Sequence, residues 1–231
     1  MKKIRVSSGI PGLDKLIEGG FKRNSVNLVA GEPGEGKTIF AIQFLLDGCK
    51  RGEASIYITF EEKKEKMYED MASFGWDLAK YEKHGSFHFL EYTPEQVKKL
   101  LVEGGGVVDA LVEKIKAKRI VIDSISSFSL LYEDELTKKE AALSLFELIT
   151  KWNCTAVLTS QSKSADHENV VDAALEFEVD SILILYHSKI KGERIRALEI
   201  MKMRGTEIPS KTYGLSITSK GIIITKDIIK L

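Results

Sequence analysis

Residues 26–38, VNLVAGEPGEGKT, decide the fold of this chain. An apolar run ends at Gly31, the pattern G-x-x-x-x-G-K-T is complete at Thr38, and apolar residues then recur at helical spacing over 39–46. A strand, a glycine-rich loop and a helix in this order are the context that a phosphate-binding loop requires. The alternative is a glycine-rich turn that matches by chance, which the flanking strand and helix disfavour. We therefore predict a nucleotide-binding site.

The residue types of this loop explain how it would hold the phosphates of a nucleotide. Glycines allow backbone N–H groups to turn towards a phosphate, and the helix N-terminus behind them adds partial positive charge. We expect Lys37 to reach the β- and γ-phosphates and the Thr38 hydroxyl to ligate Mg²⁺. The residues predicted to bind the nucleotide are Gly31, Pro33, Gly34, Glu35, Gly36, Lys37, Thr38 and Ile39.

Length and composition narrow the class of protein. The chain has 231 residues, with 34 Lys plus Arg and 34 Asp plus Glu, so its formal net charge is zero. A single α/β domain over 1–231 is expected at this length, and no bulk charge attracts nucleic acid or an anionic membrane. The sequence has no apolar run of membrane-spanning length and no C-x-x-C pattern, which predicts a cytoplasmic protein with two free thiols. Abundant Lys, Glu and Ile are typical of a thermophile.

Carboxylates follow two of the predicted strands. Glu61 and Glu62 come directly after the strand over 55–60, and Asp123 ends the strand that begins at Arg119. Ligands bind beyond the carboxyl ends of the strands in an open parallel sheet. Asp123 is therefore predicted to lie in the Mg²⁺ shell, and the glutamates to orient or deprotonate the attacking water. The alternative for the glutamates is the acidic first turn of a solvated helix.

The second half of the chain continues the sheet. The predicted strand over 154–161 ends at Gln161, which is expected at the same rim, either to sense the γ-phosphate or as an ordinary strand-end glutamine. Short strand patterns then follow at 181–187, 196–203, 214–218 and 221–225. These patterns predict a mostly parallel central sheet flanked by helices and extended by antiparallel strands at the C-terminal end.

Six motifs together resemble the RecA-like ATPases, specifically single-domain members of the KaiC group. They are GIPGLDKLIEGGF (9–21), GEPGEGKT (31–38), ITFEE (58–62), RIVIDSIS (119–126), TSQ (159–161) and KMRGTEI (202–208). The resemblance implies a RecA-like P-loop NTPase fold, with ATP held between adjacent subunits of a ring that is commonly a hexamer. It also implies that Glu61 is the catalytic base and that Glu62 supports it.

The late motif K-x-R-G-T implies a further contribution to the site. By the resemblance, Lys202, Arg204 and Thr206 are inserted from the neighbouring subunit onto the triphosphate. Cations offered to the γ-phosphate act as an arginine finger, worth on the order of 10³–10⁵ in rate. Hydrolysis would then depend on assembly. The alternative for this motif is a basic, solvated hairpin.

Two departures from the resemblance bear on function. Glu176 and Phe177 fall where the circadian members carry an autophosphorylated Ser-Thr pair, so an autokinase role is not expected. Related recombinases bind DNA through pore loops, but the equivalent stretch here, 162–180, is acidic, which opposes phosphate binding. The alternative function is a slow or silent ATP-binding accessory of a recombinase in DNA repair. Its contacts to single-stranded DNA would then come from another surface, for which the candidates are Lys63, Lys64 and Lys66.

Overall fold

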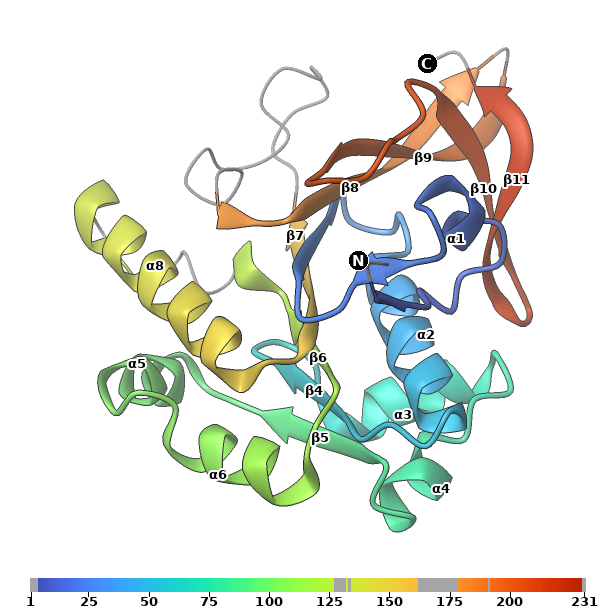
Figure 1. The fold of residues 1–231 in the computed structure, drawn as a ribbon. Coiled ribbons are helices and arrows are strands. Elements are labelled where there is room, and N and C mark those ends of the chain that lie inside the picture. The colour runs from blue at the N-terminus through green and yellow to red at the C-terminus, as the bar shows by residue number, and fades with distance from the viewer. Residues whose placement is uncertain (1–3, 127–131, 133, 162–177, 191, 230–231) are drawn as a thin grey trace.

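The computed structural model describes residues 4–126, 132, 134–161, 178–190 and 192–229 (Figure 1). Its main feature is a nine-stranded sheet in the order β11-β10-β9-β8-β3-β7-β6-β4-β5. The parallel strands are β3 (Val26–Gly31), β4 (Ser55–Thr59), β5 (Phe87–Glu91), β6 (Arg119–Asp123), β7 (Thr155–Gln161) and β8 (Ser181–Ile190). The antiparallel strands are β9 (Glu193–Met203), β10 (Thr212–Thr218) and β11 (Gly221–Ile229). The predicted α/β, RecA-like fold is confirmed.

Helices cover both faces of the parallel part of the sheet (Figure 1). One face packs against α5 (Pro94–Val102), α6 (Gly106–Ile115) and α8 (Glu135–Trp152). The other packs against α1 (Leu13–Leu16), α2 (Lys37–Lys50), α3 (Lys64–Ala72) and α4 (Leu78–Lys83). Strands β3, β4 and β6 are buried along their whole length, which explains why their sequences are apolar without alternation. None of the helices in the described part of the chain has the length and apolar character needed to cross a membrane.

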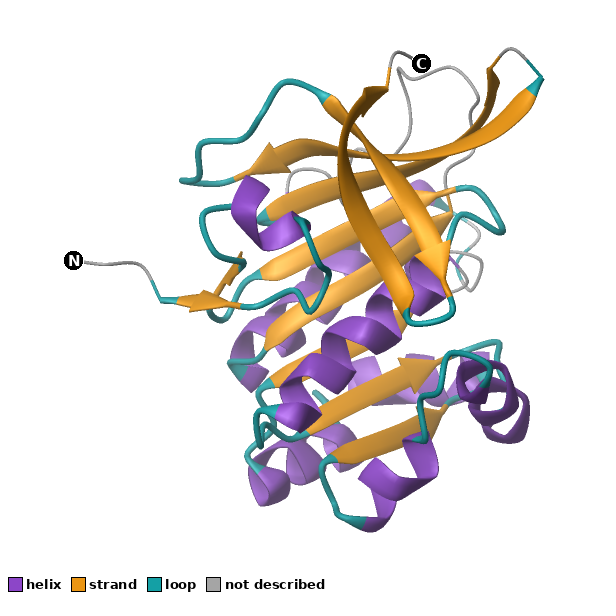
Figure 2. Cartoon of the chain, turned by 90° about the vertical axis from the view of Figure 1, so that its right-hand side faces the viewer, coloured by secondary structure: helices purple, strands orange, loops and turns teal. Residues whose placement is uncertain are grey.

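The C-terminal strands fold back towards the helix that follows the glycine-rich loop (Figure 2). In α2, the Gln43 amide donates to the carbonyl of Ile222 at 3.0 Å and accepts from its N–H at 2.7 Å. A Cβ atom on Gly36 would lie 3.1 Å from Ile217 Cδ1, so the turn between β10 and β11 approaches the loop itself. The antiparallel extension therefore supports the start of α2.

The N-terminal segment over residues 7–20 is mostly not helical. Only the four residues of α1 are helical, and β1 (Arg5–Val6) pairs with β2 (Phe21–Lys22) to form a separate two-stranded sheet. Gly12, Gly19 and Gly20 all have positive φ, which interrupts a helix. At Gly20 a Cβ atom would lie 2.1 Å from the carbonyl oxygen of Val6, so the pairing of β1 with β2 requires glycine there.

Candidate functional site

The predicted site residues before 162 meet at the carboxyl edge of the parallel strands. Gly31 at the end of β3 is level with Gln161 on β7, and Asp123 at the end of β6 is level with Thr59 on β4. Because β7 lies between β3 and β6, the glycine-rich loop and the Asp123 carboxylate come from strands that are close together. Glu61 follows β4 at the same edge.

Asp123 is a buried carboxylate that accepts hydrogen bonds from three hydroxyl groups. Its side chain is 8% exposed and accepts a hydrogen bond from the Thr38 hydroxyl at 2.8 Å. Two further hydroxyls donate to it, those of Tyr57 at 2.7 Å and of Thr159. Hydroxyl and carboxylate oxygens are the ligands that Mg²⁺ prefers, so Thr38 and Asp123 fit the metal role predicted for them.

Tyr57 and Thr159 were not found by sequence reasoning. Tyr57 occupies an apolar run on β4, and Thr159 lies in the TSQ motif of β7, in which only Gln161 was predicted to contact the nucleotide. Their link to Asp123 depends on β6 lying between β4 and β7, and no local sequence pattern encodes that order.

Lys37 lies folded over the loop. Its ammonium donates to the carbonyl oxygens of Gly31 at 2.9 Å and Glu32 at 2.8 Å. Burial lowers the pKa of Lys37, and four carboxylates oppose this shift: Glu35, Asp123, Glu61 and Glu32. A single lysine thus sits in the field of several acids, and this local balance is unfavourable to a bound anion.

Glu35 has its side chain turned into the protein. It is 4% exposed and accepts a hydrogen bond from the Glu32 N–H at 2.6 Å. The carboxylate lies close to Gly31, because a Cβ atom added to Gly31 would be only 2.2 Å from a Glu35 carboxylate oxygen. Burial raises the pKa of the Glu35 carboxyl. The Glu35 side chain therefore holds the shape of the loop, and a contact between Glu35 and the nucleotide would come from its backbone.

The remaining loop residues have backbone geometry suited to phosphate. Gly34 and Gly36 adopt φ of 85° and 100°, values that favour glycine. Pro33 is exposed at the loop surface, and Ile39 in the first turn of α2 packs partly against the core.

Glu61 and Glu62 point to different neighbours. Both backbone N–H groups donate to the Thr59 hydroxyl, at 3.3 and 3.1 Å. The Glu61 carboxylate accepts a long hydrogen bond of 3.5 Å from the Ser124 hydroxyl, next to Asp123. Glu62 instead pairs with Lys66 at 3.8 Å on the helix surface. Of the two, Glu61 is thus tied to the residue that follows Asp123.

The K-x-R-G-T motif lies at the opposite edge of the sheet. Lys202 on β9 is level with Ile182, and Ile182 is level with Leu28 near the start of β3. At about 3.3 Å per residue, Gly31 is roughly 10 Å further along the strand, and Arg204 lies further still in the other direction. Lys202 and Arg204 are therefore separated from the glycine-rich loop of their own chain.

A clasp from the N-terminal segment holds the turn that carries this motif. The Arg5 guanidinium donates to the Thr206 hydroxyl at 2.9 Å and pairs with Glu18 at 2.5 Å. The Glu18 carboxylate also accepts from the N–H of Glu207 at 3.2 Å. Arg5 was not identified from the sequence, because 201 residues separate it from Thr206.

The remaining predicted residues are Gln161, the stretch 162–177 and the three lysines considered for DNA binding. Gln161 is exposed at the rim of the loop, where its N–H donates to the Ser126 hydroxyl at 2.7 Å. The stretch 162–177, with the Glu176–Phe177 position, lies outside the described residues. Each lysine considered for DNA has a carboxylate partner: Lys63 pairs with Glu91, Lys64 with Glu82 and Lys66 with Glu62.

These features define the class of protein. A glycine-rich loop between β3 and α2, beside a carboxylate from a neighbouring parallel strand, is the arrangement typical of RecA-like α/β ATP-binding proteins. The family model "ATPase: KaiC" matches residues 6–228. The chain belongs to the KaiC family of ATPases, and the predicted resemblance is confirmed.

Relatives and a solved structure support this assignment. A UPF0273 protein of Pyrococcus furiosus is 35% identical over 236 residues, covering 96% of this chain and 94% of the relative. The circadian clock protein KaiC3 of Synechocystis is 31% identical over 228 residues, covering 95% of this chain and 45% of that protein. The crystal structure of a KaiC-like protein from Pyrococcus horikoshii OT3 superimposes with a TM-score of 0.86 at 36% identity, covering 97% of this chain and 100% of that one.

Proposed function

We propose that this protein, with residues 1–231 as one domain, hydrolyses ATP with Mg²⁺ and acts as a homo-oligomeric ring whose active sites are shared between neighbouring copies. The observation that carries the proposal is the separation of charge across the sheet. At the loop edge the Lys37 ammonium lies among four carboxylates, whereas Lys202 and Arg204 lie at the opposite edge. Membership of the KaiC ATPase family supports the reaction class.

The residues around Asp123 fit the metal that this reaction needs. Thr38 and Asp123 would hold Mg²⁺, which supplies neutralisation of the charge on the β- and γ-phosphates when bound. The hydroxyls of Tyr57 and Thr159 keep the Asp123 carboxylate in place from two sides. These hydroxyls also provide hydrogen bonds to the buried Asp123 carboxylate, whose ionised form would otherwise be costly to bury.

The loop and Glu61 account for binding and proton transfer. Backbone N–H groups of 34–38 would donate to the phosphates, and the Lys37 ammonium would exchange two carbonyl partners for phosphate oxygens. Glu61, whose carboxylate accepts a hydrogen bond from the Ser124 hydroxyl, would orient the attacking water and accept its proton as the bond from that water to the γ-phosphate forms. Glu62, paired with Lys66, supports the position of this segment.

The transition state needs positive charge that this loop lacks. A head-to-tail ring brings the amino edge of one copy against the carboxyl edge of the next, because heterologous contacts close when the rotation between copies allows it. Lys202 and Arg204 of one copy would then face the γ-phosphate of its neighbour. The clasp of Arg5 and Glu18 on Thr206 and Glu207 positions their turn.

Mixing two inactive variants tests the shared site. Lys37→Ala removes the loop cation and Arg204→Ala the finger, so each variant alone should hydrolyse ATP poorly. In a random one-to-one ring, about one quarter of the interfaces combine an intact loop with an intact finger, so about one quarter of the wild-type rate should return. The measurement is phosphate release, with mixed assembly verified by cross-linking of differently tagged copies.

The matched control is Lys226→Ala, which removes an exposed cation from the edge strand β11 and should keep wild-type activity. Mixed rings that form and stay inactive would rule out the shared site. A wild-type protein that binds ATP but shows no turnover at any concentration would instead favour the ATP-binding accessory role.

A further inference from the structure

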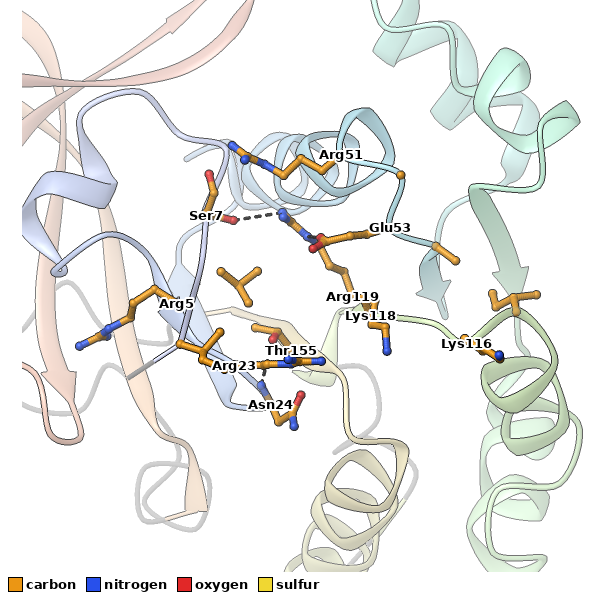
Figure 3. Close-up of a pocket in the computed structure, with 15 residues that line it drawn as sticks. Arg5, Ser7, Arg23, Asn24, Arg51, Glu53, Lys116, Lys118, Arg119 and Thr155 are labelled. Carbon is orange, nitrogen blue, oxygen red and sulfur yellow. Dashed lines mark hydrogen bonds and ion pairs between the residues drawn. The ribbon is translucent and has the colours of Figure 1, made fainter. Parts of the chain in front are cut away.

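A cavity opens at the edge of the sheet opposite the glycine-rich loop (Figure 3). Its volume is about 520 Å³. Its walls come from the N-terminal segment, from the residues that precede β3, β4 and β6, and from the first residues of β6 and β7. Six of its lining residues are basic and one is acidic: Arg5, Arg23, Arg51, Lys116, Lys118 and Arg119, with Glu53. The cavity is therefore lined mainly by positive charge, although the net charge of the chain is zero.

Three of these cations are already neutralised. The Arg119 side chain is 1% exposed and pairs with Asp47 at 3.0 Å and Glu53 at 2.6 Å. Arg51 pairs with Asp47 at 2.8 Å, and Arg5 pairs with Glu18. Arg119 also donates to the backbone carbonyl of Ser7, so these residues build a satisfied wall rather than a ligand contact (Figure 3).

The other three cations are exposed and have no carboxylate partner among the described residues. They are Arg23, Lys116 and Lys118. Arg23 and Lys118 lie near Thr155, and two hydrogen bonds of Thr155 join the segments that carry them (Figure 3). The N–H of Asn24 donates to the Thr155 hydroxyl at 3.0 Å, and the N–H of Thr155 donates to the Lys118 carbonyl at 2.9 Å. Mutual repulsion of these cations favours a counter-anion.

We propose that this cavity binds a small anion carrying two or more phosphate groups, such as a diphosphate-bearing metabolite or nucleotide. The planar Arg23 guanidinium can bind one phosphate through two parallel hydrogen bonds, and the two lysines supply point charges for a second. The volume falls within the roughly 300–1,000 Å³ typical of small-molecule sites. None of the lining residues is aromatic, so the cavity lacks the stacking surface that single-stranded nucleic acid uses.

The site can be tested independently of the glycine-rich loop. Sodium tripolyphosphate is titrated calorimetrically into full-length Lys37→Ala, in which the loop has lost its cation. We expect about one equivalent to bind. Adding Arg23→Ala and Lys118→Ala should weaken that binding by about tenfold to a hundredfold, as expected for lost charge-assisted hydrogen bonds. The matched control adds Lys80→Ala and Lys83→Ala on α4, which should leave the affinity unchanged, and thermal melts verify that each variant is folded.

Four results would overturn the proposal. Equal affinity with and without Arg23 and Lys118 would place the anion elsewhere, and no binding to Lys37→Ala would leave only the loop as a phosphate site. Inorganic phosphate binding as tightly as tripolyphosphate would reject a ligand with two or more phosphate groups. A 20-nucleotide DNA strand that binds through Arg23 and Lys118, where tripolyphosphate does not, would identify a nucleic-acid surface instead.

Discussion

Replacing Tyr57 with phenylalanine tests how the protein holds its principal carboxylate. The Tyr57 hydroxyl is buried and donates to Asp123 at 2.7 Å, as one of three hydroxyls on that carboxylate. The ring itself stacks on Phe89 with centroids 5.3 Å apart, a contact that phenylalanine preserves. Tyr57→Phe therefore removes one hydrogen bond to a buried charge and little else.

The expected loss of stability follows from that single contact. A hydrogen bond to a charged group contributes about 1.5–3 kcal/mol to the free energy of unfolding. In a chain of this size each kcal/mol lowers Tm by about 2–4 °C, so Tm should fall by about 3–12 °C. The control is Tyr68→Phe, which removes a partly exposed hydroxyl 3.1 Å from Glu82 and should cost less than about 1 kcal/mol.

The same substitution makes a second prediction, for stability at alkaline pH. Burial, and then the neighbouring Asp123 charge, raise the pKa of Tyr57 well above its ordinary value of 10.0. The native state thus keeps a proton that the unfolded chain releases, so this residue's contribution to stability falls as pH rises above about 10. Tyr57→Phe lacks that loss, and the gap between the wild type and the variant should narrow between pH 9 and pH 11.

The assay is guanidinium unfolding followed by tryptophan fluorescence at one protein concentration, at pH 7.5 and above pH 10. Fixing the concentration matters because an oligomer gains stability by mass action. If Tyr57→Phe proves no less stable than Tyr68→Phe at pH 7.5, the argument that hydroxyl donors stabilise the Asp123 charge is refuted.

Three further predictions address the chemistry, the loop and the thiols. Glu61→Gln should keep ATP affinity but lower turnover by about 10²–10⁴, whereas Glu62→Gln should have the smaller effect. Phosphate release measures turnover, and a fluorescent ATP analogue measures affinity. A larger loss of turnover in Glu62→Gln would exchange the roles of the two glutamates. The pKa of Glu35 is raised from 4.5, so the contribution of this carboxyl to stability falls as pH rises through the shifted value. Glu35→Gln should therefore be more stable than the wild type at pH 7.5 but not at pH 4. Equal changes in the free energy of unfolding at the two pH values would contradict this. Burial raises the pKa of the Cys49 thiol, and it raises the pKa of the Cys154 thiol to about 11. A thiol-reactive dye should therefore label the native protein far more slowly than the unfolded chain. Rapid labelling of the native protein would show that the thiols are accessible.

The extent of the strands shows one limit of prediction from sequence. The charged segment after His187 predicts a strand end, yet β8 continues to Ile190 and β9 begins at Glu193. A hairpin extends as long as its backbone N–H and C=O groups pair across the ladder, and exposed charged side chains do not prevent that.

Local sequence determines the elements and the nucleotide loop. The strand, loop and helix of 26–50 follow from apolar periodicity and from glycines at positions of positive φ, all of which are encoded within a few residues. The carboxylates at strand ends were predictable for the same reason, because a parallel sheet brings the carboxyl ends of its strands to one edge.

Tertiary structure alone decides which distant residues complete the site. The order β4-β6-β7 brings Tyr57 and Thr159 to Asp123, and the pairing of β9 with β8 sends Lys202 to the edge away from its own loop. The clasp of Arg5 on Thr206 joins residues 201 positions apart. Such contacts depend on strand order and register. These are properties of the whole packed sheet and cannot be predicted from any single stretch of sequence.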